Sequence, residues 1–319
     1  MDSFTVSNGD IRLHVVADGP ADSPEPPILC VHGWPELSHS WRHQIAHFAG
    51  AGRRIAALDV RGYGESSKPE PVEAYAMAEL AADVAAVVDA LGGRAILFGH
   101  DWGAPIVWQT ALRHADKVLA VAGLSVPYTP MGERAFLDVM REVYRDRFFY
   151  QLYFQEPGVA EAEFESDPDA LLKIYHGISG EGIADAFSRP KGPHDKFLTG
   201  MPKPDRLPAW LSAEDLAHYN ERFARGGWRG PLNRYRAQMI DHRDRAPVAG
   251  RRIAQPACFV AGTLDPVRRF LPGHDLYANA GAHCDDYRGT TLIEGAGHWV
   301  QQERPAEVNA ALDAFVRGL

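Results

Sequence analysis

The stretch "FGHDWGAPIVW", from Phe98 to Trp108, contains an apolar strand end followed at once by the start of a helix. Gly99 and Gly103 stand two residues to either side of Asp101. Small residues at these two places are typical of a sharp strand-to-helix turn that lifts its central side chain above a sheet. Ser is the usual central residue of such turns, so Asp101 raises the question of what a carboxylate does there.

The composition is that of a globular protein and excludes several other classes. The chain has 319 residues, of which 45% are hydrophobic and 24% charged, as in ordinary globular domains. Its net charge of −9 argues against nucleic acid or an anionic membrane as the main partner. No apolar run approaches twenty residues, and residues 1–10 lack the pattern of a signal peptide. The three cysteines are too scattered for a disulfide framework, so we expect buried thiols in a cytoplasmic protein.

Apolar strands alternate with helical patterns at both ends of the chain. The expected strands are Ile28–Val31, Ile55–Leu58, Ala95–Phe98, Val118–Leu124, Ala257–Ala261 and Thr291–Ile293. Helical spacing of apolar residues from Leu80 to Leu91 ends at a Gly-Gly pair, and an amphipathic helix closes the chain. This alternation predicts an α/β fold with a mostly parallel central sheet that helices cover on both faces.

The alternation stops after Pro127. Residues 128–246 contain helical patterns, proline-rich connections and many aromatic residues, and Ser212 has the features of a helix N-cap. We expect this segment to be an inserted helical lid (cap) domain, with residues 1–127 and 247–319 forming the core domain. A lid inserted there would cover the carboxyl ends of the strands, where open α/β sheets bind ligands.

A carboxylate at the crest of the turn can act as a nucleophile without a base, because it is already ionised at neutral pH. It attacks saturated carbon that carries a leaving group and forms a covalent ester. The alternative is that Asp101 only caps the following helix, a position that Asp favours.

The motif "HGWPE", from His32 to Glu36, follows the strand Ile28–Val31. In this type of sheet, the loop after that strand supplies one backbone N–H of an oxyanion hole, and the residue after the nucleophile supplies the other. We therefore assign the oxyanion hole to the amides of Trp34 and Trp102. Gly33 lets the chain pass close to the pocket, and Pro35 fixes the turn, in which a cis Trp34–Pro35 bond is an option. A plain Gly-Pro turn is the alternative.

Two residues after later strands complete a nucleophile, acid and histidine order. Asp265 ends the strand in "VAGTLDPV", and His298 lies in the loop "EGAGHWVQQERP". We expect His298 to be the general base and Asp265 to orient it by accepting its second N–H. Each alone could be an ordinary loop residue. His100 is expected to be a buried, hydrogen-bonded spacer.

With these residues in place, the sequence resembles the α/β-hydrolases of the epoxide hydrolase and haloalkane dehalogenase branch, whose nucleophile is Asp. The resemblance covers nearly the whole chain. "YQLYFQEPGVAEAE" (Tyr150–Glu163) and "RGPLNRYR" (Arg229–Arg236) resemble the lid segments of the hydrolase domain of mammalian soluble epoxide hydrolase. Arg234 departs from the family, which often has an aromatic residue there. The mammalian N-terminal phosphatase domain has no counterpart in this sequence.

The resemblance implies an epoxide hydrolase in which Tyr150 and Tyr235 are the acids for the epoxide oxygen. A phenol is neutral at pH 7 and can donate its O–H to that oxygen. The expected substrates are a small apolar epoxide and water, with no cofactor or metal, in a monomer or homodimer. The expected pocket residues are His32, Gly33, Trp34, Pro35, Trp102, Tyr150, Tyr235 and Trp299. Four other tyrosines are expected to pack in the core: Tyr144, Tyr153, Tyr175 and Tyr219.

Three alternatives remain open. A haloalkane dehalogenase would share Asp101, Trp102 and His298 but needs halide donors, and "HGWPE" lacks the Asn that commonly serves. A fluoroacetate-type dehalogenase would need an Arg where Trp102 stands. A non-catalytic binding protein with this fold would be expected to have lost a catalytic residue, and none is missing from the pattern.

Overall fold

Eight strands form one sheet in the structure, a computed structural model that describes residues 1–188 and 190–319. The strands are β1 (Asp2–Asn8), β2 (Ile11–Asp18), β3 (Ile28–Val31), β4 (Ile55–Leu58), β5 (Ala95–His100), β6 (Val118–Leu124), β7 (Ile253–Gly262) and β8 (Cys284–Ile293). Their order across the sheet is β1-β2-β4-β3-β5-β6-β7-β8. The pairs β1–β2 and β2–β4 are antiparallel, and all other neighbouring pairs are parallel. The predicted mostly parallel sheet is therefore confirmed.

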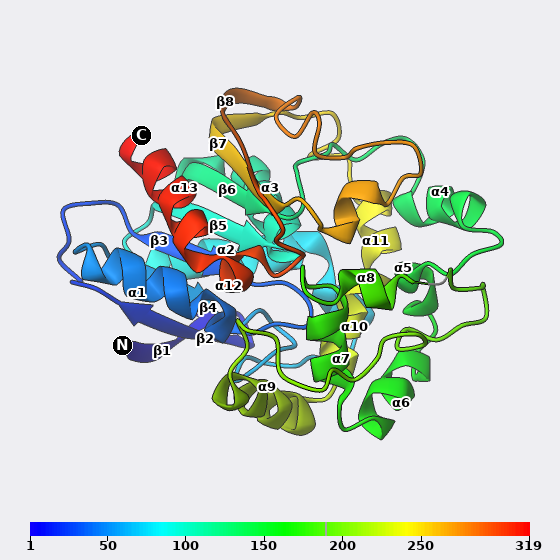
Figure 1. The fold of residues 1–319 in the computed structure, drawn as a ribbon. Coiled ribbons are helices and arrows are strands. Elements are labelled where there is room, and N and C mark those ends of the chain that lie inside the picture. The colour runs from blue at the N-terminus through cyan, green and yellow to red at the C-terminus, as the bar shows by residue number, and fades with distance from the viewer. Residues whose placement is uncertain (189) are drawn as a thin grey trace.

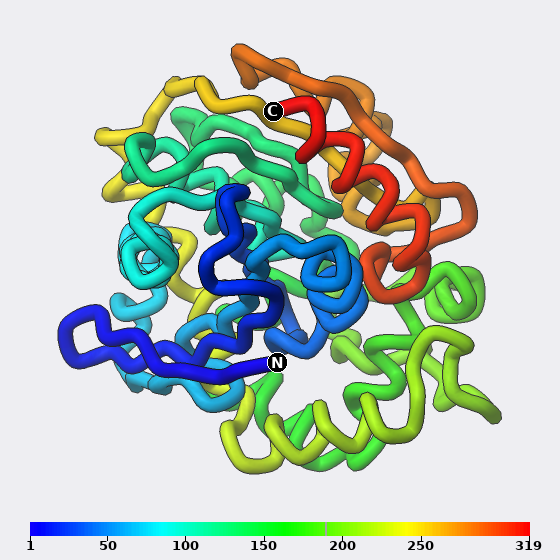
Figure 2. Tube along the Cα trace, turned by 90° about the vertical axis from the view of Figure 1, so that its left-hand side faces the viewer, coloured from blue at the N-terminus to red at the C-terminus, as the bar shows by residue number. Residues whose placement is uncertain are grey.

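Helices cover both faces of this sheet. The core helices are α1 (Arg42–Gly50), α2 (Met77–Ala90), α3 (Gly103–Arg113), α12 (Val300–Glu303) and α13 (Pro305–Arg317). Short 3-10 helices span Ser38–Trp41, Val72–Tyr75, Ala115–Lys117 and Pro266–Arg269. Figure 1 shows α1 and α13 in front of the sheet and α2 and α3 behind it, and Figure 2 shows the sheet between these two layers from the side.

Alternate residues of β3 explain why both faces are covered. Ile28 and Cys30 join one apolar cluster with residues of α1 and α13, whereas Leu29 and Val31 join the other cluster with residues of α2 and α3. All four side chains are fully buried. A strand that is apolar at every position must have a layer on each side, as parallel sheets require.

The segment between β6 and β7 consists of helices joined by irregular connections, and its described residues contain no strand. It contains α4 (Phe136–Val143), α5 (Tyr150–Tyr153), α6 (Val159–Ser166), α7 (Ala170–Gly177), α8 (Ile183–Ala186), α9 (Ala213–Gly226), α10 (Arg229–Arg236) and α11 (Gln238–Arg243). Ser212 accepts a hydrogen bond from the Asp215 N–H and caps α9, as predicted. Figure 1 shows these helices gathered at one end of the sheet.

Three further features of the fold concern an edge hairpin, the cysteines and the length of the helices. β1 and β2 form a hairpin that was not predicted from the sequence, and it turns at Gly9 with a φ of 58°. The three cysteines are buried and free. Within the described part of the chain, no helix is both long and apolar enough to cross a membrane.

Candidate active site

Asp101 stands at the crest of a sharp turn between β5 and α3. Its φ is 49°, a left-handed conformation that residues other than glycine seldom adopt. The turn needs its flanking glycines, because a Cβ on Gly103 would lie 1.9 Å from the carbonyl oxygen of Val31. A Cβ on Gly99 would lie 2.3 Å from the carbonyl oxygen of Gly103. Trp102 is the N-cap residue of α3 and no side chain caps it, so the Asp101 carboxylate points elsewhere.

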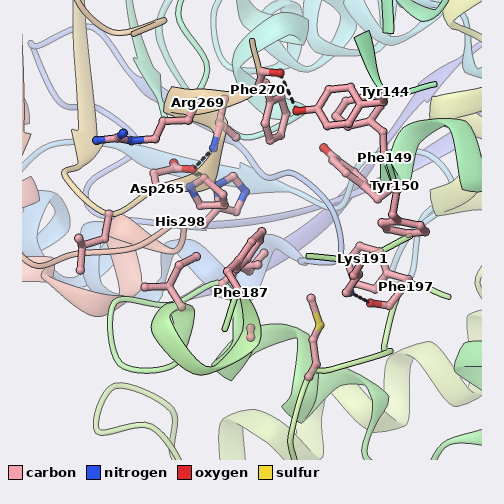
Figure 3. Close-up of a pocket in the computed structure, with 18 of the residues that line it drawn as sticks. Tyr144, Phe149, Tyr150, Phe187, Lys191, Phe197, Asp265, Arg269, Phe270 and His298 are labelled. Carbon is pink, nitrogen blue, oxygen red and sulfur yellow. Dashed lines mark hydrogen bonds and ion pairs between the residues drawn. The ribbon is translucent and has the colours of Figure 1, made fainter. Parts of the chain in front are cut away.

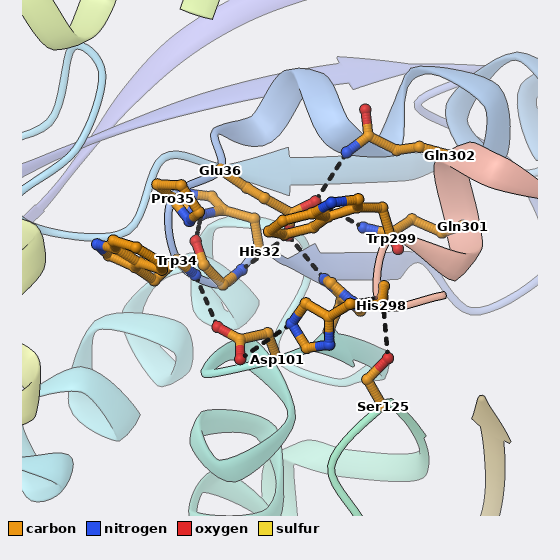
Figure 4. Close-up of polar contacts among 12 residues, drawn as sticks. His32, Trp34, Pro35, Glu36, Asp101, Ser125, His298, Trp299, Gln301 and Gln302 are labelled. Atoms are coloured by element: carbon orange, nitrogen blue, oxygen red, sulfur yellow. Dashed lines mark hydrogen bonds and ion pairs between the residues drawn. The ribbon is translucent and has the colours of Figure 1, made fainter. Parts of the chain in front are cut away.

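The two oxygens of Asp101 have different neighbours, which Figure 4 shows. Oδ1 accepts a hydrogen bond of 2.8 Å from the backbone N–H of Trp34. Oδ2 lies 3.4 Å from Nε2 of His298. The side chain is nearly buried, with 7% of its residue surface exposed. One oxygen is therefore held by a backbone amide, and the other faces an imidazole.

The loop after β3 brings its backbone against the carboxylate. A Cβ on Gly33 would lie 2.4 Å from both Cβ and Oδ1 of Asp101, so only glycine allows this approach. The Trp34–Pro35 peptide bond is cis. The amide of Trp102 is the other predicted donor, and it belongs to the residue directly after Asp101 at the start of α3.

His298 and Asp265 form an ion pair next to the Asp101 carboxylate. Nδ1 of His298 lies 3.1 Å from each oxygen of Asp265, and the N–H of Val267 donates to Asp265 Oδ1 at 2.9 Å. Burial by itself lowers the pKa of His298, but the charges of Asp265 and Asp101 and their hydrogen bonds outweigh it and raise the pKa well above its usual value. The same pairing overcomes burial at Asp265 and lowers the pKa of its carboxyl.

A buried polar network holds the backbone of His298. Its carbonyl oxygen accepts hydrogen bonds from Nε2 of His100 at 2.7 Å and from Oγ of Ser125 at 3.1 Å. Nδ1 of His100 pairs with Glu36 at 2.7 Å, and Glu36 also accepts from the N–H of Gly33. Figure 4 shows Glu36, Ser125 and His298, which belong to this network. His100 is thus the predicted hydrogen-bonded spacer, and the network joins the loop after β3 to the loop that carries His298.

Glu36 and Ser125 are functional candidates that sequence reasoning missed. Glu36 also accepts from the side-chain amides of Gln301 and Gln302, both at 2.9 Å. Ser125 follows β6 with a φ of 65°, which is a strained conformation. A serine in the sequence does not indicate such a conformation. Position in "HGWPE" was the only available signal for Glu36, since the side chains that pair with it are more than sixty residues away along the chain.

Tyr150 and Tyr235 come from α5 and α10 and face the same cavity. Their ring centroids are 5.8 Å apart with an interplanar angle of 77°, and Nε2 of Gln151 donates to the Tyr150 hydroxyl at 2.9 Å. Burial is the main cause that raises the pKa of both phenols well above the usual value. Both hydroxyls therefore keep their protons at neutral pH.

A cavity of about 610 Å³ connects these groups. Figure 3 shows Asp265 and His298 on one side of it and Tyr144, Phe149 and Tyr150 on the other. The lining also includes Trp34, Asp101, Phe187, Phe197, Tyr235, Leu264, Val267 and Phe270. Most of these side chains are apolar or aromatic, so the cavity suits an apolar ligand. Among the described residues, no group of His, Cys, Asp and Glu could hold a metal ion.

Five predicted pocket residues are not among the residues that line the cavity: His32, Gly33, Pro35, Trp102 and Trp299. The His32 ring is occupied by the carbonyl of Gly33 and the N–H of Val60. The Trp299 indole donates to the carbonyl of Tyr175 at 2.9 Å, and its ring packs on His298. Trp299 therefore supports His298, which lines the cavity.

Tyr144 corrects the prediction that it packs in the core. It lines the cavity, because its hydroxyl donates to the carbonyl of Phe270 at 2.7 Å and holds the ring against Phe149. Tyr175 and Tyr219 are fully buried as predicted. Tyr153 is partly buried and donates to Glu163 at 2.9 Å.

Known proteins share this architecture over nearly the whole chain. Residues 26–305 match the family model of the alpha/beta hydrolase fold. The chain is 44% identical to Epoxide hydrolase A of Mycobacterium tuberculosis, over 98% of this chain and 97% of that protein. It is 37% identical to Bifunctional epoxide hydrolase 2 of Rattus norvegicus, over 98% of this chain and 54% of that protein. The crystal structure of Epoxide Hydrolase A from Mycobacterium thermoresistibile superposes with a TM-score of 0.91 at 42% identity, covering 100% of this chain and 98% of that one.

Proposed function

The chain belongs to the epoxide hydrolases of the α/β-hydrolase fold family, and on that premise we propose that it converts an epoxide and water to a vicinal diol through a covalent ester on Asp101. The observation that supports the proposal most directly is that the two carboxylate oxygens of Asp101 have different partners. Oδ1 is held by the Trp34 N–H, and Oδ2 is directed to the side of His298. A helix cap would need neither contact.

In the first step, Oδ2 of Asp101 attacks an epoxide carbon and the bond from that carbon to the epoxide oxygen breaks. The departing alkoxide is strongly basic, so it leaves readily only when it is protonated or hydrogen-bonded. The hydroxyls of Tyr150 and Tyr235 are two neutral donors in the cavity, which supports their assignment as the acids. The products of this step are an ester on Asp101, a free hydroxyl on the neighbouring carbon, and a phenolate on the tyrosine that gave up its proton.

In the second step, His298 takes a proton from water, and the resulting hydroxide attacks Cγ of Asp101. The charge that develops on Oδ1 is stabilised by the N–H groups of Trp34 and Trp102. The diol then leaves with the proton from His298. The proton left on the Asp101 carboxyl passes through water to the phenolate of the first step, so the Asp101 carboxylate and both phenols are restored. Ester formation removes one of the two negative charges that raise the pKa of His298, which prepares the imidazole to act as a base at this stage.

We also propose that residues 128–246 act as a cap domain over a core of residues 1–127 and 247–319. The cap supplies Tyr150 and Tyr235, and the core supplies the nucleophile, the base and the amides. Trp34 of the core packs against Phe154, Phe197 and Tyr235 of the cap, which supports a closed aromatic wall around an apolar epoxide.

The oxygen source of the diol tests the covalent mechanism. In water enriched in heavy oxygen, a single turnover with enzyme in excess should give mostly unlabelled diol, and the label should appear in the peptide containing Asp101. His298→Gln should form the ester and stall, so intact mass spectrometry should detect an adduct of one substrate. Asp101→Ala should give neither adduct nor diol. Labelled diol on the first turnover, with no adduct on His298→Gln, would contradict the proposal in favour of direct attack by water.

Choice of leaving group separates this activity from dehalogenation. The purified protein should convert styrene oxide to its diol and release no halide from 1-chlorobutane or 1,2-dibromoethane. A phenol suits an oxygen that needs a proton, whereas a halide leaves without one. Halide release without diol formation would identify a dehalogenase, and binding without turnover of either class would identify a binding protein.

A further inference from the structure

Arg234 is a buried cation next to the candidate active site that the two proposed steps do not use. It precedes Tyr235 on α10, and only 2% of its surface is exposed. Its guanidinium forms an ion pair with Asp241 and donates to the backbone carbonyl of Tyr75. Asp241 in turn accepts from the N–H of Met77 at the start of α2, at 2.6 Å. The position of the guanidinium is therefore fixed by three elements.

The free face of this guanidinium lies on the ring of Trp102. The distance from Cζ of Arg234 to the ring centroid is 4.7 Å, which is a cation–π contact. Trp102 also packs edge-on against Tyr235, with ring centroids 5.3 Å apart and an interplanar angle of 81°. Burial is the main cause that raises the pKa of Tyr235, whereas hydrogen bonding with the Trp102 side chain, in which an indole can only donate, lowers it. A cation on one face of an indole draws electron density from it and strengthens its N–H as a donor.

Tyr150 has a matching arrangement, since its hydroxyl accepts from Nε2 of Gln151 at 2.9 Å. A phenol that accepts an N–H from the protein keeps its own O–H for a ligand, and its negative charge is better stabilised when it gives up that proton. The other groups that face Tyr235 disfavour the loss of its proton. Burial, Tyr150, Asp101 and Tyr63 all raise the pKa of Tyr235, and the Trp102 contact lowers it.

We propose that Arg234 is a positioning residue for epoxide opening, which acts through the Trp102 indole to aim the Tyr235 hydroxyl at the epoxide oxygen and to strengthen it as an acid. The inference builds on the proposed function, because it assigns a task within the first step. Arg234 itself does not touch the substrate, since it does not line the described cavity. Ester hydrolysis does not use Tyr235, so it should not depend on Arg234.

The test is to measure the two steps separately in Arg234→Met, by rapid-quench mass spectrometry of the ester with styrene oxide. We expect ester formation to slow about tenfold and ester hydrolysis to stay within about twofold. Arg234→Lys, which keeps a cation over the ring, should recover most of the rate. Trp102→Phe keeps the backbone amide but removes the indole N–H, so adding Arg234→Met to it should cause little further loss.

Arg236→Met is the matched control for general damage to α10. Arg236 follows Tyr235, is also buried, and pairs with Glu161 without contacting Trp102. Arg236→Met should destabilise the fold about as much as Arg234→Met does, while its rate of ester formation stays within about threefold of the parent rate. Arg234→Met leaves the Asp241 charge buried and unpaired. If this variant does not fold, the same measurements are made on the double variant Arg234→Met/Asp241→Asn, which removes both charges.

The outcomes separate this inference from the proposed function. Ester formation at the parent rate in Arg234→Met would overturn the inference. Equal slowing of both steps, additive losses with Trp102→Phe, or the same loss in Arg236→Met would also overturn it, because each indicates a purely structural role. A parent protein that forms no ester with any epoxide would contradict the proposed function instead.

Discussion

At the scale of single residues, the candidate site depends on charges that change during the reaction. His298 lies between two carboxylates, and both of them raise its pKa. In the proposed mechanism, only the Asp101 charge disappears when the ester forms, whereas Asp265 keeps its charge and its hydrogen bonds to the ring. The imidazole can therefore be a cation before epoxide opening and a base afterwards, with no movement of the backbone.

The ion pair of His298 should make stability depend on pH. Its folded pKa lies above the unfolded value of about 6.5, so the pair stabilises the fold fully below that pH. This contribution is lost as the pH rises through the folded pKa. The difference in Tm between the parent and His298→Gln should therefore shrink from pH 6 towards pH 10. A thermal-shift series over this range measures it, and a constant difference would mean that His298 is not charged in the folded protein.

Tyr150→Phe and Tyr235→Phe should each slow epoxide opening by roughly 100-fold, because each removes a donor to the developing oxyanion. The double variant should nearly abolish turnover. Phe keeps the ring contacts among Tyr150, Phe154 and Tyr235, so Tm should change little. Steady-state diol formation and thermal unfolding check both parts. Parent-like turnover in the double variant would remove the tyrosines from the mechanism.

Sequence reasoning reached some site residues and missed others for a physical reason. Asp101, Asp265 and His298 each follow a strand at a recognisable turn, and the structure brings all three together. The roles assigned to them stay predictions. Ser125 and Tyr144 have no local signature, because their importance comes from contacts with residues more than 120 positions away. Such contacts exist only after the chain has folded.

At the scale of elements, the site depends on how closely the loop after β3 approaches the turn after β5. Gly33→Ala would place a methyl group 2.4 Å from the Asp101 carboxylate and displace either the nucleophile or the Trp34 amide. We expect turnover to fall more than about 100-fold, because small displacements of reacting groups have effects of that size.

Gly50→Ala is the control for this change. Gly50 ends α1, has no positive φ, and nothing lies within 4 Å of an added Cβ there. Its diol formation should match the parent, and its Tm should not fall. Normal turnover by Gly33→Ala would show that the loop moves freely with respect to Asp101.

Elements of the sheet interior were easier to predict from sequence than those at its edge. β3 and β4 are runs of four apolar residues with fully buried positions, and they match the predicted strands. β2 is buried only at alternate positions, and its polar residues broke the apolar run on which the prediction relied. The turn at Asn8, Gly9 and Asp10 was the available hairpin signal.

At the scale of the whole molecule, the largest apolar cluster contains residues from both sides of the proposed domain boundary. Leu29 and Val31 of the sheet share it with Phe154, Phe164 and Trp228 of the helical segment. The cap and the core should therefore unfold together, as a single cooperative unit. Calorimetry should give one transition with equal calorimetric and van't Hoff enthalpies. Two resolved transitions would mean that the cap unfolds independently.

The proposed nucleophile comes from the turn after β5, whereas the two proposed acids come from α5 and α10, and this separation has a stereochemical consequence. Displacement from the side opposite the breaking bond inverts the attacked carbon and leaves its neighbour unchanged. Cyclohexene oxide, which is superposable on its mirror image, would thus give only the trans diol. Because the aromatic wall that holds the ring is itself chiral, the two ring carbons are not equivalent towards Asp101. One mirror image of the diol should therefore predominate on a chiral column.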